Sequence, residues 1–70
     1  MSKKFDGEML KQLRIESNLK QTELAEMGGV GRDRICRWEK GEEPSFDKLQ
    51  KLAKALEVRT DDLFYFTNKA

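Results

Sequence analysis

The chain has 70 residues, with 14 Lys and Arg, 13 Asp and Glu, one Cys and no His. This length allows one small domain, whose stability is marginal because it buries only about 60% of its unfolded surface. A single Cys without His excludes an internal disulfide, the usual zinc sites and His-based catalytic triads. The net charge of +1 by itself favours no class of partner.

Apolar spacing predicts five short helices, at about residues 7–17, 21–27, 32–40, 46–56 and just after 60. No strand is expected, because β-branched residues are scattered and no segment alternates with period two. Asp6, Ser45 and Thr60 are the expected N-caps of the first, fourth and fifth helices. Asn18 is expected to close the first helix, and Gly41 follows the third as its C′ residue.

The apolar residues at helical spacing form one predicted core. Its expected members are Leu10, Leu13, Leu24, Ala25, Val30, Ile35, Trp38, Phe46, Leu49, Leu52, Ala53, Leu56 and Leu63. Trp38 is assigned to this core because it lies three residues after Ile35 on the same helix face. Lys48, Lys51 and Lys54 are expected on the solvated side of the fourth helix.

The segment from Gln21 to Gly41 carries the functional signal. Ala25 is small enough to let a second helix approach closely, and Gly29 supplies the turn of a sharp bend. The helix that follows is anchored by Ile35 and Trp38. This order predicts a helix-turn-helix, with two helices at about 90–120° joined by a short turn.

The joint spacing from Leu19 to Gly41, followed by Pro44-Ser45 and the Leu and Ala pattern of residues 49–56, resembles the Xre or Cro/C1-type helix-turn-helix family. The resemblance covers about residues 8–64. It implies an all-α, compact, five-helix, lambda-repressor-like DNA-binding domain over residues 1–70. The helix-turn-helix would occupy about residues 20–40, after a short N-terminal arm at 1–6.

The resemblance also implies which residues contact DNA. Arg32 and Asp33 match the base-reading pair, and Arg37 matches a further groove-facing position. Four more residues match positions that contact phosphate or fix the register, namely Lys20, Gln21, Arg34 and Lys40. Arg14 and Glu39 match a structural ion pair. The sequence departs from the family where Gly28 replaces a bulky apolar residue, which leaves a gap for Met27 to fill, and where Glu42 and Glu43 would repel phosphate.

Helix geometry agrees with these assignments. At about 100° per residue, the face opposite the predicted core carries Asp33, Cys36, Arg37 and Lys40. Arg32 lies at the edge of this opposite face. Arginine is the usual partner of guanine in the major groove, so at least one G·C pair should matter. Asp33 is assigned either to cytosine or to an i,i+4 pair with Arg37. Cys36 is interpreted as a small filler beside the groove, and a redox role is the alternative.

Three consecutive aromatics, Phe64, Tyr65 and Phe66, follow Leu63 near the end of the sequence. One short helix cannot bury all of them, so they are candidates for a homodimer interface on the fifth helix. A two-fold dimer of this kind would place its recognition helices about 34 Å apart on a palindromic operator. The alternative is that they close the protein's own core.

The resulting prediction is a cytoplasmic, sequence-specific regulator of transcription, a repressor that binds double-stranded DNA as a homodimer. No cofactor, metal, catalytic residue or membrane contact is expected. The alternative is an antitoxin or protein-interaction module that uses the same fold with a regulatory protein partner. The charge sum supports a local basic face, because residues 31–40 carry four basic and two acidic residues while residues 41–62 are net acidic.

Overall fold

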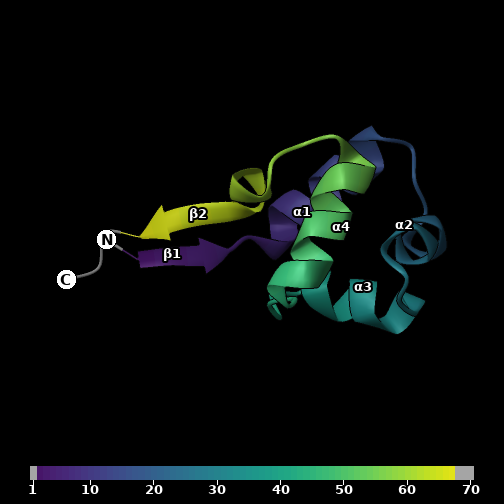
Figure 1. Cartoon of the computed structure of the whole chain (residues 1–70), viewed down its shortest axis with the longest axis horizontal. Helices are drawn as coiled ribbons and strands as arrows, with labels where there is room; N and C mark the ends of the chain where they lie inside the picture. Colours follow the sequence, from purple (N-terminus) through teal and green to yellow (C-terminus); the bar gives the residue numbers. More distant parts are fainter. Residues whose placement is uncertain (1, 68–70) are drawn as a thin grey trace.

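The computed structural model describes residues 2–67; Met1 of the expected arm lies outside them. The elements, in chain order, are β1 (Ser2–Phe5), α1 (Gly7–Glu16), α2 (Gln21–Gly28), α3 (Arg32–Glu39), α4 (Phe46–Leu56), the 3₁₀ turn η1 (Thr60–Leu63) and β2 (Phe64–Thr67). Figure 1 shows the four helices packed as one body, from which the two strands project as a ribbon. In the described part of the chain, no helix is long and apolar enough to cross a membrane.

Local signals set the helix boundaries. The Asp6 side chain accepts a hydrogen bond from the backbone N–H of Met9 at 3.1 Å, which confirms it as the N-cap of α1. Ser45 caps α4 in the same way, at 3.4 Å from Lys48 N. Gly29 ends α2 in the left-handed conformation, with φ of 69°, and so turns the chain toward α3.

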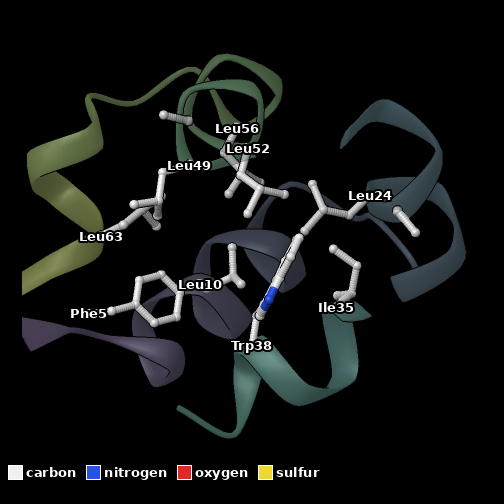
Figure 2. Packing of buried hydrophobic residues seen from close by; sticks show 11 residues of the cluster. Phe5, Leu10, Leu24, Ile35, Trp38, Leu49, Leu52, Leu56 and Leu63 are labelled. Carbon is white, nitrogen blue, oxygen red and sulfur yellow. The ribbon is translucent and has the colours of Figure 1, made fainter. Parts of the chain in front are cut away.

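The core forms where α1, α3 and α4 meet around Trp38. The buried apolar residues are Phe5, Leu10, Leu24, Ala25, Ile35, Trp38, Leu49, Leu52, Ala53, Leu56 and Leu63. Figure 2 shows Trp38 pointing from α3 into this cluster and Phe5 reaching it from β1. The predicted core is therefore largely confirmed, and Phe5 is an addition to it.

Phe46 was expected in the core, but its side chain is 65% exposed. The buried residues of α4 centre on a direction about 70° away from Phe46, at 100° per residue. Phe46 also lies at the first position of the helix, where no further turn covers it. The apolar stripe of α4 thus begins at Leu49 and not at Phe46.

Two strands replace the expected arm and most of the expected fifth helix. β1 pairs with β2 in antiparallel register, with Phe5 opposite Phe64 and Lys4 opposite Tyr65. The all-α, five-helix prediction is wrong in this respect. Only the 3₁₀ turn η1 remains helical there, and its N-cap is Arg59, whose backbone N–H donates to Asp62 at 3.0 Å, and not Thr60.

Glycines permit two close contacts between helices. Leu52 reaches Gly28, where an added Cβ would lie 3.4 Å from its Cδ2 atom. The gap expected at Gly28 is thus closed by α4, while Met27 stays half exposed. At Gly7 an added Cβ would collide with the carbonyl oxygen of Trp38, so the start of α1 lies directly against the end of α3.

Candidate nucleic-acid interface

The outer face of α3 is strongly polar and exposed. Ile35, Trp38 and Glu39 are the buried residues of this helix, and they hold one side of it against the body. The remaining charged side chains are exposed, namely Arg32, Asp33, Arg34 and Arg37, together with Lys40 at the C-cap. Asp33, Arg37 and Lys40 lie near the middle of the exposed face, because they are the residues most nearly opposite the buried ones.

Arg37 already has a carboxylate nearby. Its Nε atom lies 3.8 Å from Oε2 of Glu42, in the loop after α3, and both side chains are more than half exposed. Of the two roles expected for Asp33, the bracing of Arg37 is thus taken by Glu42. A base that binds Arg37 has to compete with this carboxylate, which is weak competition because an exposed pair is worth only about 0–1 kcal/mol.

A buried carboxylate fixes α3 to the rest of the domain. Arg14 of α1 donates from Nε to Oε2 of Glu39 at 2.6 Å, and its Nη1 donates to the carbonyl oxygen of Leu19 at 2.8 Å. Gln21, the first residue of α2, donates from Nε2 to Oε1 of Glu39 at 3.0 Å. Glu39 therefore joins three helices, and its side chain is only 4% exposed.

The starts of α2 and α3 form one shallow depression. The residues that line it are Arg14, Lys20, Gln21, Thr22 and Arg32. The N-cap position of Lys20 carries half of a capping box, because the Glu23 side chain accepts its backbone N–H at 2.7 Å while a lysine side chain cannot accept a bond. Lys20 is an exposed residue, as phosphate contact requires.

Cys36 lies at the other flank of α3. It is partly buried and lines a depression together with Glu8, Lys11, Gln21, Glu39 and Lys40. The expectation that it fills space beside the groove remains a prediction. No group of three or more His, Cys, Asp or Glu side chains within residues 2–67 is placed to hold a metal ion.

The aromatic residues expected at the dimer interface lie on β2 and not on a helix. Phe64 is half buried, with its ring 6.1 Å from that of Phe5 in an edge-to-face arrangement. Tyr65 and Phe66 are exposed, by 45% and 69%. The three residues are thus not equivalent, since the first closes the core and the next two face solvent.

Two residues that shape the interface were not expected to do so. Gly7 lets α1 approach the end of α3, and no local motif in the sequence indicated this contact. Glu42 was expected only to repel phosphate, and its pairing with Arg37 depends on how Gly41 turns the chain, with φ of 114°.

This arrangement defines a helix-turn-helix protein, in which α2 and α3 are joined by the turn at Gly29 and α3 presents a charged face. Residues 10–63 match the family model described as helix-turn-helix. The chain belongs to the Xre or Cro/C1-type helix-turn-helix family, which is a family of DNA-binding regulators. The comparison with curated proteins returned no match.

Solved structures of similar fold include three regulators. The P22 c2 repressor in complex with a synthetic operator is 34% identical, with a TM-score of 0.79 over 81% of this chain and 88% of the repressor chain. The restriction-modification controller protein C.AhdI from Aeromonas hydrophila is also 34% identical, with a TM-score of 0.78 over 83% of this chain and 89% of its own. The biofilm regulator SinR from Bacillus subtilis, in complex with DNA, is 32% identical, with a TM-score of 0.76 over 81% and 94%.

Proposed function

We propose that this protein is a sequence-specific repressor that inserts α3 into the major groove and binds a palindromic operator as a homodimer. The observation that carries the proposal is the exposed face of α3, where Arg37 and Lys40 project from a helix whose opposite side is locked into the core. A rigid helix with exposed arginines suits direct recognition of bases, because base contacts need side chains held in fixed register.

The proposed roles divide between base reading and positioning. Arg32, Asp33 and Arg37 would read base edges, with guanine as the preferred partner of the arginines. Lys20, Gln21, Arg34 and Lys40 would contact phosphates and set the register. The side-chain amide of Gln21 already donates one hydrogen bond to Glu39. The first role of Gln21 is therefore to brace the start of α2 against α3.

The charge distribution favours specific over non-specific binding. The net charge is only +1, and Glu42 and Glu43 follow α3 directly. Such a chain attracts DNA weakly at long range, since non-specific affinity comes almost entirely from phosphate neutralisation. Contacts in the groove, together with the binding of two half-sites by one dimer, would therefore supply most of the affinity.

The test is a footprint of the protein on the DNA upstream of its own gene, followed by measurements of affinity for the protected site and for a scrambled duplex. We expect a protected palindrome and a specific site bound at least about 1,000-fold more tightly, the lower end for specific regulators. Equal affinity for both duplexes at physiological salt would refute the proposed function.

A second candidate function is protein interaction, and one comparison favours it. The SinR/SinI complex also matches, at 32% identity and a TM-score of 0.76, over 81% of this chain and 57% of that chain. A partner protein could then regulate or replace DNA binding in this chain. Binding that weakens steeply as salt rises identifies the DNA function, whereas a protein complex that survives high salt with no specific DNA site would identify the alternative.

A further inference from the structure

The ribbon of β1 and β2 carries two exposed lysines, Lys3 and Lys4, in different surroundings. Neighbouring residues of a strand point to opposite faces. The ammonium group of Lys3 is engaged on one face, 3.1 Å from the carboxylate of Asp61 and 4.7 Å from the centre of the Phe64 ring. Among residues 2–67, Lys4 has no carboxylate partner. Its positive charge is therefore available to a ligand.

Lys4 lies beside the loop that follows α3. Tyr65 is directly opposite Lys4 in the ribbon, so the two side chains leave the same face. One depression joins this part of the ribbon to the loop, and its lining residues are Lys3, Lys4, Phe5, Gly41, Glu43 and Tyr65. The ribbon thus adjoins the C-terminal end of α3, and Figure 1 shows β1 on the side of the ribbon nearer α3.

The two ends of α3 differ in charge. The major groove is about 12 Å wide and has a phosphate backbone along each wall, so phosphates flank a helix placed in it on both sides. At the N-terminal end, Lys20 and Arg32 line one depression. At the C-terminal end, Lys40 is followed closely by the carboxylates of Glu42–Glu43, which repel phosphate. Further positive charge at this end has to come from another element, and Lys4 is the cation that the ribbon brings there.

We propose that Lys4 and Tyr65 form a phosphate-binding site, through which the ribbon contacts the DNA backbone beside the C-terminal end of α3. This inference rests on the proposed function, because α3 in the groove brings that backbone within reach. The ammonium group of Lys4 supplies the charge, and the hydroxyl of Tyr65 donates a hydrogen bond to a phosphate oxygen. Lysine and tyrosine side chains both contact phosphates in protein–DNA complexes, where such contacts fix the register.

The exposure of Tyr65 and the position of Glu43 agree with this role. The Tyr65 side chain is 45% exposed, and the phenol gives it a polar group that the neighbouring Phe64 lacks. Glu43 lines the same depression and opposes an anion there. A single ammonium group beside a carboxylate therefore holds a phosphate only when the rest of the interface has placed the duplex.

The salt dependence of DNA binding tests the site, with Lys4→Gln as the variant and Lys54→Gln as its matched control. Lys54 is exposed and lies near the end of α4 that is farther from α3 (Figure 1). Both variants remove one exposed positive charge. Each phosphate contact adds about 0.9 to the slope of log affinity against log salt.

We expect Lys4→Gln to reduce this slope by about 0.9 for each bound copy, and Lys54→Gln to leave it unchanged. Between 50 and 200 mM salt, the wild type should then lose about 3–4-fold more affinity per copy than Lys4→Gln. A wild-type slope in Lys4→Gln, or an equal reduction in Lys54→Gln, would overturn the proposal.

The variant Tyr65→Phe tests the hydroxyl, because it keeps the aromatic ring. We expect binding to weaken by about 2–10-fold, the range for one neutral hydrogen bond. The salt slope should stay the same, since no charge is removed. Unchanged affinity would overturn a site built from both residues.

Ethylation interference locates the contact on the duplex. Ethylation of a phosphate removes its charge and weakens any contact made to it. We expect Lys4→Gln to become insensitive to ethylation at one phosphate in each half-site, and Lys20→Gln to become insensitive at a different one, on the other wall of the groove. The wild-type pattern in Lys4→Gln would contradict a contact from the ribbon.

A scrambled duplex separates this inference from the proposed function. Phosphate contacts carry no sequence information, so Lys4→Gln should reduce the salt slope on both duplexes. Equal wild-type affinity for the protected site and the scrambled duplex would refute the proposed function, even if Lys4→Gln reduced the slope. Specific binding with a slope that Lys4→Gln leaves unchanged would refute the present inference alone.

Discussion

The buried ion pair between Arg14 and Glu39 gives the sharpest test of how α3 is held. In the variant Arg14→Met, the Glu39 carboxylate stays buried, with its side chain 4% exposed, and keeps the bond from Gln21 at 3.0 Å. Removal of one partner of a buried pair costs about 3–5 kcal/mol, because the other charge loses its compensation. The carbonyl oxygen of Leu19 loses its bond from Arg14 as well.

This loss is large for such a small domain. A chain of 70 residues has a total stability of roughly 4–10 kcal/mol, at about 0.05–0.15 kcal/mol per residue. Arg14→Met should therefore lower Tm by about 15–30 °C, since 1 kcal/mol corresponds to about 4–8 °C in a domain of this size. Urea and thermal unfolding followed by circular dichroism measure both quantities.

The double variant Arg14→Met, Glu39→Leu completes the test. Because no charge is then left buried, its stability should exceed that of Arg14→Met. It should stay below the wild type, because the carbonyl oxygen of Leu19 and the Gln21 amide both lose their partners. Its operator binding should persist, because neither residue is assigned a DNA contact. The reasoning fails if the double variant is as unstable as Arg14→Met, or if Arg14→Met alone loses less than about 1 kcal/mol.

Two further predictions concern the neighbours of α3. Gly7→Ala should destabilise the domain by about 1–3 kcal/mol in urea unfolding. The new Cβ would meet the carbonyl oxygen of Trp38 and lie 2.8 Å from Gly41 N. Unchanged stability would contradict this close approach of α1 to the end of α3. Glu42→Gln should tighten binding to all duplexes by about 2–5-fold at low salt, the range for exposed charge contacts, since it removes a negative charge near phosphate. The operator should gain the most, because the change also frees Arg37. Titrations at two salt concentrations check this, and weaker binding would contradict it.

Local sequence predicted the helical part of the fold well. α4 begins and ends where its spacing and the Ser45 cap indicate, and Gly29 takes the left-handed turn that its position demands. The charged face of α3 also follows from sequence, because Ile35 and Trp38 fix which side is buried. In these segments, the residues that specify the structure, such as caps, glycines and apolar positions, lie within a few residues of the structure they specify.

The ribbon could not be predicted in the same way. Each strand has four residues, too few for a clear alternation, and its partner lies at the opposite end of the sequence. Phe5 stands in a polar segment, and its burial follows from its pairing with Phe64 and its place in the core cluster. The same limit applies to Arg37 and Glu42, whose approach depends on the turn at Gly41 and not on helix periodicity.

The central claim is that α3 reads bases through Arg37, and a comparison of Arg37→Ala with Lys40→Ala tests it most directly. Both side chains are exposed on the same face, but one is assigned to bases and the other to phosphate. For Arg37→Ala we predict a loss of about 1–3 kcal/mol on the operator with little change on scrambled DNA. For Lys40→Ala we predict equal weakening on both duplexes and a salt slope reduced by about one. If Arg37→Ala weakened binding equally on both duplexes, the assignment of α3 as a base-reading helix through Arg37 would be wrong.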